Sequence, residues 1–247
     1  MNTPVAAFIR STKEAVKRFL YRHSTHVSQQ GQDFWVSCEV FNEKRGGYFV
    51  DIGANDGVSI SNTYLLERKY GWQGICVEAN PGIYNLLKRN RRVTCENVCI
   101  DQGEGVVTFV LKGALGGIVD EGLDNTPEDR RKDIVEMPTV PLEQVLIRNG
   151  APTVIDYLSV DVEGAEERVL SGFPFHEYLF RCITIERASA NLVDILQGNG
   201  YVLIKKLPAL DSFFVHKSFF EDYRRNLFSY YKKIRFTFTI WDPRTAP

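Results

Sequence analysis

The chain has 247 residues, of which 44% are apolar and 25% are charged, and its 30 basic and 31 acidic residues leave a net charge of -1. This composition is typical of a soluble globular protein, and the near-zero charge argues against a chain that binds nucleic acid or an anionic membrane through its overall field. No apolar run reaches the ~18 residues of a membrane-spanning helix. The length suits one α/β domain with at most a small appendage.

The cysteines and the N-terminal stretch indicate a cytoplasmic protein. Residues 1–23 lack a secretory signal, and their apolar spacing predicts an amphipathic basic helix that packs on the core or, less favourably, lies on a membrane surface. There is no CxxC pair, so we expect buried thiols in a reducing compartment. The five cysteines are Cys38, Cys76, Cys95, Cys99 and Cys182.

Strand-like and helix-like runs alternate from residue 47 onward. Strands are expected at 47–52, 74–79, 93–100, 105–112, 154–162, 181–186 and 201–206, with a last, antiparallel edge strand at 212–217. Helices are expected at 61–71, 81–90, 141–150, 164–173 and 191–200, and an irregular polar excursion at 120–133. The alternation predicts a doubly wound α/β fold with a mostly parallel sheet, helices on both faces and an antiparallel edge strand. Such sheets bind ligands outside the carboxyl ends of their strands.

The turn after the first strand reads DIGANDG, residues 51–57, and it is neither a P-loop nor a GxGxxG motif. Gly53 permits a tight turn and a close backbone approach, and Asn55 tolerates the left-handed conformation. Asp51 places a carboxylate at the pocket floor, which would repel a pyrophosphate and attract a cationic amino-acid group. Glu78 ends the next strand 21 residues after Gly57 (78 − 57), near the ~20 residues expected for a ribose-binding acid.

These acids predict a pocket for a positively charged nucleoside without phosphate, and S-adenosylmethionine fits that description. The alternative, that Asp51 and Asn55 merely cap a strand–helix turn, is disfavoured by the spacing of Glu78. Asp101 ends the third expected strand, and its carboxylate or neighbouring backbone could meet the adenine amino group. A simple turn aspartate is the equal alternative for Asp101.

Several segments resemble the FkbM family of S-adenosylmethionine-dependent methyltransferases. They are residues 28–36, 46–81, 140–146 and 157–173, with a weaker match at 183–186. The resemblance implies a class I methyltransferase (Rossmann-like) fold and methyl transfer to a hydroxyl oxygen, often on a sugar or a secondary metabolite. By position it implies a set of cofactor-binding residues, namely Asp51, Gly53, Asn55, Gly57 and Glu78, with Asn80 beside the ribose or adenine.

We expect one domain with two additions. Residues 1–45 form an N-terminal helix and an SQxGQD segment packed on the core, and residues 46–217 form the S-adenosylmethionine-binding domain. Residues 218–247 form an aromatic and basic extension, which suits an acceptor lid, edge structure or homodimer contact better than a nucleic-acid surface. In the SQxGQD segment, Gln29, Gln32 and Asp33 either fold over the cofactor as a lid or pack under the sheet.

Acids at further strand ends indicate the chemistry. Asp161 lies at the end of the strand expected at 154–162, next to the cofactor's methyl in this fold, Glu163 opens a helix, and Glu186 ends the neighbouring strand. Asp161 or Glu163 is then the general base or binds the acceptor hydroxyl; alternatively Asp161, Glu163 and Glu186 bind Mg²⁺ or Ca²⁺. His216 is a further candidate base, with an edge-strand histidine as the alternative. The expected partner is a small-molecule or glycan acceptor, and a cofactor-binding scaffold without turnover is the rival function.

Overall fold

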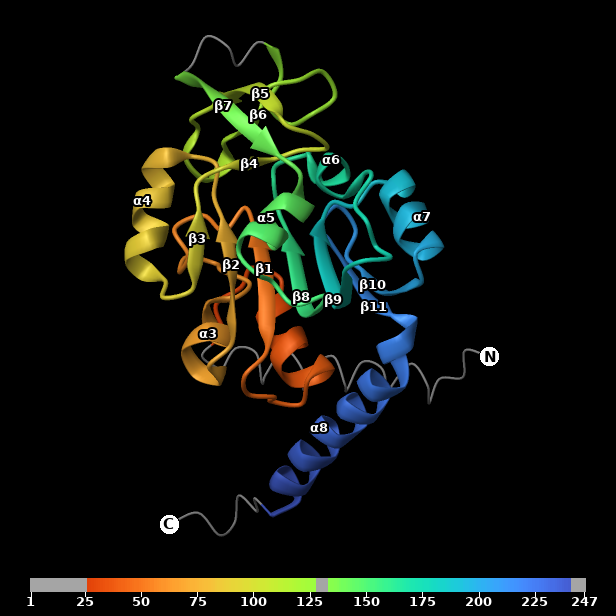
Figure 1. Cartoon of the computed structure of the whole chain (residues 1–247). Coiled ribbons are helices and arrows are strands. Elements are labelled where there is room, and N and C mark those ends of the chain that lie inside the picture. The colour runs from red at the N-terminus through yellow and green to blue at the C-terminus, as the bar shows by residue number, and fades with distance from the viewer. Residues whose placement is uncertain (1–25, 128–132, 241–247) are drawn as a thin grey trace.

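The computed structural model describes residues 26–127 and 133–240, with side chains through residue 233, so the helix expected within residues 1–23 lies outside the described residues. Its centre is a seven-stranded sheet in the order β10-β11-β9-β8-β1-β2-β3 (Figure 1). The strands are β1 (Tyr48–Ile52), β2 (Gln73–Val77), β3 (Thr94–Glu96), β8 (Val154–Val160), β9 (Leu179–Glu186), β10 (Tyr201–Lys206) and β11 (Asp211–His216).

The predicted sheet is confirmed, with one difference at its edge. Strands β3, β2, β1, β8 and β9 run parallel, and β11 runs antiparallel to both of its neighbours. The antiparallel strand β11 is the second strand from the edge of the sheet, and β10 is the edge strand. The burial pattern explains this order, because β11 is buried from Asp211 to Val215, whereas β10 is partly exposed and ends in Lys205 and Lys206. Lysines are common on edge strands because they discourage pairing with other chains.

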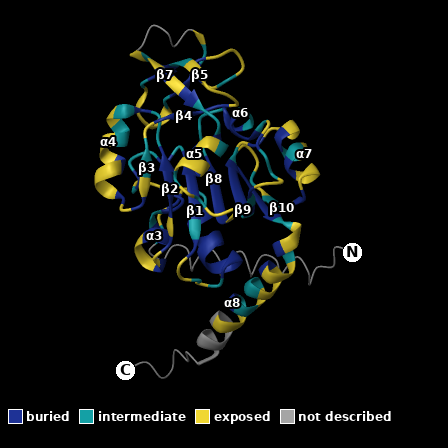
Figure 2. Cartoon of the chain, viewed as in Figure 1, coloured by how far each residue is buried: buried dark blue, intermediate teal, exposed yellow. Residues whose placement is uncertain are grey.

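Helices cover both faces of the central sheet, and a separate hydrophobic core lies between the sheet and the helices on each face. Leu146, Leu170 and Leu192 pack on one face, and Trp35, Leu66 and Tyr223 pack on the other. The strands between them are buried, whereas the outer surfaces of the helices are exposed (Figure 2). The first face carries α5 (Leu142–Arg148), α6 (Glu166–Leu170) and α7 (Ala190–Gly198). The second carries α2 (Gln32–Phe34), the π-helical segment η1 (Trp35–Val40), α3 (Tyr64–Tyr70), α4 (Pro81–Asn90) and α8 (Phe220–Ile240).

A second sheet lies above the carboxyl ends of the central strands (Figure 1). Its order is β4-β7-β5-β6, with β4 (Cys99–Ile100), β5 (Gly105–Val110), β6 (Gly117–Ile118) and β7 (Ile134–Val140). The stretch 93–100, expected as one strand, is divided between the two sheets. The sequence did not predict β7, because Pro138 lies within it and proline argues against an interior strand.

The C-terminal helix α8 begins after β11 and η4 (Lys217–Phe219) and lies at the opposite end from the second sheet (Figure 1). It packs on η1, where the Tyr231 hydroxyl donates to Glu39 at 2.6 Å and the Asn226 amide donates to the Val40 carbonyl at 2.9 Å. The described part of the aromatic and basic extension therefore packs against η1, at the opposite end of the molecule from the second sheet. None of the helices among the described residues is both long and apolar enough to cross a membrane.

Candidate functional site

A cavity of about 370 Å³ opens at the carboxyl ends of β1, β2, β8 and β9, where the sequence predicts a ligand site. Its volume falls within the ~300–1,000 Å³ of small-molecule sites. Polar walls come from the turn after β1, the loop after β2 and the residues that follow β8 and β9. An apolar wall is formed by side chains of the second sheet and its surroundings, which include Val98, Ile100, Phe109 and Ile118.

The turn after β1 requires its glycine and its asparagine. Gly53 has a φ of +81°, and a Cβ built there would lie 1.7 Å from the backbone oxygen of Asp161. Asn55 adopts the left-handed conformation, as predicted, with a φ of 50°, and its N–H donates to Glu78 Oε2 at 3.0 Å. The turn after β1 therefore contacts both the residue that follows β2 and the residue that follows β8.

Gly57 and Asn80, both implied as cofactor residues, do not line the cavity. A Cβ at Gly57 would meet Leu87 at 2.6 Å and Arg91 at 2.7 Å, so this glycine allows the turn to pack against α4. The Asn80 side chain caps α4, because its Oδ1 accepts from the N–H groups of Gly82 and Ile83. The structure therefore gives both residues packing and capping roles and does not bring their side chains to the pocket.

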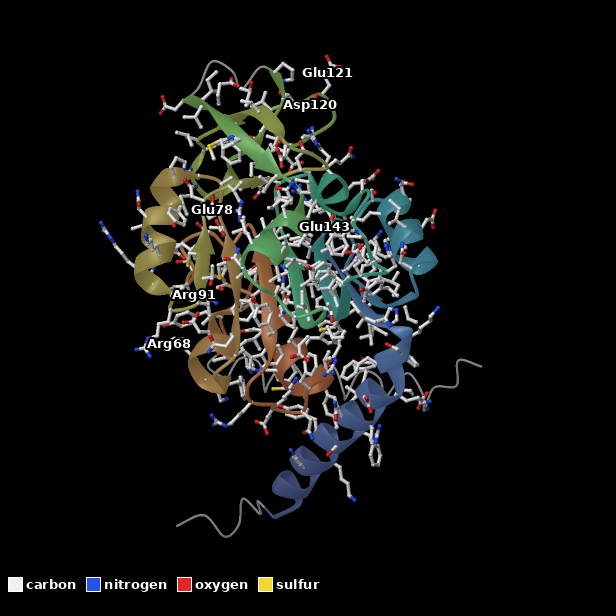
Figure 3. The ribbon with its side chains drawn as sticks, viewed as in Figure 1. Arg68, Glu78, Arg91, Asp120, Glu121 and Glu143 are labelled. Carbon is white, nitrogen blue, oxygen red and sulfur yellow. The ribbon has the colours of Figure 1, made fainter. Side chains whose placement is uncertain are left out.

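Glu78 lies at the carboxyl end of β2, as predicted (Figure 3), and it also lines the cavity. Its two oxygens accept backbone N–H bonds from Asn55 at 3.0 Å and Asn80 at 2.8 Å. Burial raises the pKa of Glu78 in spite of these bonds. Each oxygen keeps a further lone pair, so the carboxylate can still accept hydroxyl groups of a ligand.

Asp51 is buried at the floor of the cavity, with 3% of its surface exposed. Its Oδ2 accepts from the Thr63 hydroxyl at 2.6 Å, and Ser159 also hydrogen-bonds the carboxylate. Burial raises the pKa of Asp51 although these bonds and the charge of Arg91 act in the opposite direction. Arg91 is itself bound to Glu67 at 2.5 Å, so it does not enter the cavity as a free cation.

The three acids Asp161, Glu163 and Glu186 meet at the cavity, each with one oxygen within 4.8 Å of the others. Burial raises the pKa of Asp161 well above its usual value, and the nearby Glu186 raises it further through repulsion and a hydrogen bond. Burial and Glu186 also raise the pKa of Glu163 to about 7, against the opposing charge of Arg187. Such a cluster shares its protons, because close carboxylates cannot all be ionised at once, so one carboxyl group stays protonated at pH values where a neighbour is ionised.

Arg187 completes this cluster, and the sequence analysis missed it. It donates to Glu186 at 3.1 Å and Glu163 at 3.4 Å, and it also binds Asp124 from the loop beyond β6. Among the described residues that line the cavity it is the only lysine or arginine, opposite five acids. The excess of acids disfavours a phosphate ligand. Arg187 directly follows Glu186, the last residue of β9, and this position at a strand end could have marked it as a candidate site residue.

Two predicted site residues lie elsewhere. Asp101 follows β4 of the second sheet and binds Arg168, with 2.9 Å between its Oδ1 and the Arg168 Nε, and its side chain does not line the cavity. His216 lies at the end of the sheet opposite to the cavity, because β11 runs antiparallel to β9 and its last residue is therefore remote from the carboxyl ends of the parallel strands. The His216 ring packs edge-on against Tyr201, with 5.0 Å between the ring centroids. The structure therefore does not bring His216 to the cavity.

Within the SQxGQD segment, two residues lie at the cavity, where a lid was expected, and a third is buried against the core, as in the alternative. Gln29 and Gln32 line the cavity, and Gln32 Nε2 donates to Asp211 at 3.0 Å beside the end of β9. Asp33 is fully buried and accepts from the Ser28 hydroxyl at 2.5 Å, so it holds the segment in place. Asn62, on the loop before α3, also lines the cavity and is 8% exposed, and no sequence pattern singled it out.

The family model for the methyltransferase FkbM domain matches residues 51–233. Among solved structures, the chain is similar to the methyltransferase FkbM from Methylobacillus flagellatus KT, at 15% identity and a TM-score of 0.45, over 77% of this chain and 48% of that one. It is also similar to the METTL16 methyltransferase domain, at 13% identity and a TM-score of 0.44, over 74% of this chain and 64% of that one.

A TehB-like methyltransferase from Corynebacterium glutamicum is similar at 13% identity and a TM-score of 0.41, over 87% of this chain and 100% of that one. The chain thus spans less than two thirds of the METTL16 and FkbM chains to which it is similar. No curated protein matches it. The fold is a doubly wound α/β fold with a seven-stranded, mostly parallel sheet and helices on both faces. Because the family model matches most of its length, this chain belongs to the FkbM family of S-adenosylmethionine-dependent methyltransferases.

Proposed function

We propose that the chain is an O-methyltransferase that transfers a methyl group from S-adenosylmethionine to a hydroxyl of a sugar, a glycan or a glycosylated metabolite. The observation that carries the proposal is the buried Asp161 carboxyl group at the cavity, with its raised pKa and its hydrogen bond to Glu186. A hydroxyl oxygen must lose its proton as it attacks, and a carboxylate of raised pKa is a suitable acceptor for that proton.

The cavity residues fit the cofactor in charge and shape. The Gly53 turn provides a surface that a Cβ would fill, and Glu78 offers acceptor oxygens for ribose hydroxyls. Asp51 offers a negative charge for the amino-acid group, and the apolar wall near Phe109 and Ile118 suits the adenine. When bound, the cofactor would supply an electrophilic methyl group on a positively charged sulfur.

Asp161 would take the proton of the acceptor hydroxyl. Glu186 would help, because its hydrogen bond and negative charge raise the basicity of Asp161. Arg187 would hold Glu163 and Glu186 in place through its ion pairs with both. The protein would otherwise act by positioning, since holding two reactants in line removes much of the entropic barrier.

The charge of the cavity supports a neutral, hydroxyl-bearing acceptor. Carboxylates and the side-chain amides of Gln29 and Gln32 can hydrogen-bond the hydroxyl groups of a sugar, whereas an anionic acceptor would meet an excess of acids. The free cysteines Cys38, Cys76, Cys95, Cys99 and Cys182 support our placement of the protein in the cytoplasm.

A metal-assisted reaction is the second candidate, favoured by the close grouping of Asp161, Glu163 and Glu186. Oxygen ligands of this kind suit Mg²⁺ or Ca²⁺. Arg187 argues against it, because its guanidinium already balances Glu163 and Glu186. Enzyme treated with EDTA and assayed with and without Mg²⁺ distinguishes the two: full activity without metal supports Asp161 acting alone.

Three variants test the proposed function. Asp51→Ala and Glu78→Ala should each abolish binding of S-adenosylhomocysteine in calorimetry, and wild-type affinity in both would remove the proposed pocket. Asp161→Asn should keep this affinity and lose turnover, so an unchanged kcat would contradict its role as the base. A scaffold without turnover would bind S-adenosylmethionine but release no S-adenosylhomocysteine with any hydroxylated acceptor.

A further inference from the structure

Ile60, on the loop between β1 and α3, combines two unfavourable features. Its φ is 50°, in the left-handed region, where a β-branched residue is an outlier because its Cβ crowds the following carbonyl oxygen. Its side chain is apolar and 55% exposed, so it adds little to the packing of the core. Residues in strained conformations of this kind cluster at ligand sites. Because Ile60 lines the cavity, its strain indicates contact with a ligand.

Strained residues of the chain gather at this cavity. Seven of the described residues other than glycine have a positive φ, and four of these line the cavity, namely Asn55, Ile60, Glu163 and Arg187. Asn55 donates to Glu78, and Arg187 donates to Glu163, so three of the four have polar partners. The side chain of Ile60 has no polar atom, and the surface that it offers to a ligand is apolar.

Two turns fix the backbone on either side of Ile60. Before it, the Asp56 side chain accepts from the Ser59 N–H at 2.7 Å. After it, Ser61 Oγ accepts from the Tyr64 N–H at 3.1 Å. The turns therefore hold the isoleucine side chain at a defined place on the cavity wall.

Leu115 offers a second exposed apolar side chain to the same cavity. It ends the 3₁₀ turn η2 (Gly113–Leu115) between β5 and β6, and it is 57% exposed. The buried Asn125 holds this turn, since its Nδ2 donates to the Leu115 carbonyl at 3.3 Å. Because Ile60 and Leu115 line the cavity and are more than half exposed, they lie where the cavity opens to solvent. These two residues are called the apolar rim below.

We propose that the apolar rim binds an apolar group that is attached to the hydroxyl-bearing part of the acceptor. This inference rests on the proposed function, because it narrows the class of acceptor. The acceptor is then amphiphilic: its hydroxylated ring reaches Asp161 inside the cavity, and its alkyl or aromatic aglycone lies on Ile60 and Leu115. Such contacts favour binding in proportion to the apolar area that they remove from water.

The position of the rim favours an acceptor over the two other possible occupants. The adenine of the cofactor already has an apolar wall near Phe109 and Ile118, deeper in the fold, where both residues are buried. A second copy of the chain would cover the rim but leave the acid-lined interior unfilled. An amphiphilic acceptor contacts both the apolar rim and the polar interior.

The test compares octyl β-D-glucopyranoside with methyl β-D-glucopyranoside by calorimetry on the full chain with S-adenosylhomocysteine bound. Both carry the same sugar, and both are kept below the concentration at which the octyl compound forms micelles. The wild type should bind the octyl compound about 10- to 100-fold more tightly, as expected for burial of about two or three methylene groups. Ile60→Asn and Leu115→Asn should each lower this preference by about 3- to 10-fold and keep the wild-type affinity for S-adenosylhomocysteine.

Three outcomes would overturn the inference. Equal affinity of the wild type for the two glycosides, or binding of neither, would mean that the rim binds no apolar group. A fall in S-adenosylhomocysteine affinity in Ile60→Asn that matches the fall in octyl preference would assign the rim to the cofactor. A wild-type dimer in sedimentation that dissociates in Ile60→Asn would assign it to a second copy. Failure of the proposed function has a separate sign, namely a wild type that binds no S-adenosylhomocysteine, and it would remove the acceptor role of the rim as well.

Two further variants keep the comparison valid. Asparagine and glycine both tolerate the left-handed conformation, so Ile60→Gly replaces Ile60→Asn if the latter does not fold. Ile147→Asn is the matched control, because Ile147 is an isoleucine of α5 that is 60% exposed and lies outside the cavity lining. It should leave the octyl preference unchanged. An equal loss of preference in Ile147→Asn would show that the octyl chain binds exposed apolar residues elsewhere on the surface, and it too would overturn the inference.

Discussion

The substitution Gly53→Ala should damage both stability and cofactor binding, because it acts at the point where three strand ends meet. The added Cβ would lie 1.7 Å from the Asp161 backbone oxygen, half of the 3.4 Å at which ordinary van der Waals contact begins. Since the obstructing atom is backbone, it cannot rotate away as a flexible side chain would. The turn or the end of β8 must therefore move.

The magnitude has two parts. Gly53 has a φ of +81°, and the left-handed conformation costs an L-residue roughly 1–2 kcal/mol. Overpacking a filled site costs a further ~1–3 kcal/mol. The sum of about 2–5 kcal/mol is a large share of the ~5–15 kcal/mol that stabilises a typical domain. For a chain of this length it corresponds to a fall in Tm of about 4–20 °C.

Gly71→Ala is the matched control. Gly71 has a φ of +69° at the end of α3, and an added Cβ there would meet nothing within 4 Å. It should therefore lose only the ~1–2 kcal/mol of the conformational part and bind S-adenosylhomocysteine normally. Urea unfolding and calorimetry of both variants make the comparison. Equal losses of stability in the two variants, with wild-type affinity in Gly53→Ala, would refute the steric argument.

Three further predictions concern charge and position. The pKa of Glu163, raised to about 7 from an ordinary 4.5, means that its contribution to stability is present below about pH 4.5 and lost as the pH rises to about 7. Glu163→Gln should therefore lessen the fall in unfolding free energy across that range, and an unaltered pH profile would contradict the raised pKa. Arg187→Gln removes a charge that lowers the Glu163 pKa, so the Glu163 carboxyl resonance should titrate at higher pH, and a shift to lower pH would contradict the ion pair. His216→Ala should keep the wild-type kcat, because His216 lies at the opposite edge of the sheet; a loss of more than about tenfold in a folded variant would restore it as a candidate base.

The sequence could predict the residues at strand ends, because alternation fixes which edge of a parallel sheet they share. Asp51, Glu78, Asp161 and Glu186 all line the cavity for this reason. The sequence could not show which residues of a motif face the ligand. Gly57 lies in the same turn as Gly53, but it faces α4, and only the packed structure distinguishes the two.

The distance of His216 from the cavity has a simple geometric reason. The first residue of β11, Asp211, pairs with Glu186 at the carboxyl end of β9. Because β11 is antiparallel to β9, it begins at the cavity and its last residue, His216, lies at the other end of the sheet. The cavity residues that no sequence pattern predicted, Arg187 and Asn62, are held by contacts between distant segments. Arg187 binds Asp124, and Asn62 binds Ser159, and neither spacing follows a local period that a sequence pattern could reveal.

The reversed direction of β11 also decides where other molecules can be attached. The chain leaves the sheet at the edge remote from the cavity, and α8 extends from there (Figure 1). A fluorophore, a fusion protein or a sensor surface joined to the end of α8 is separated from the ligand entrance by the full height of the sheet. Enzyme captured through this helix should thus remain open to its cofactor and acceptor.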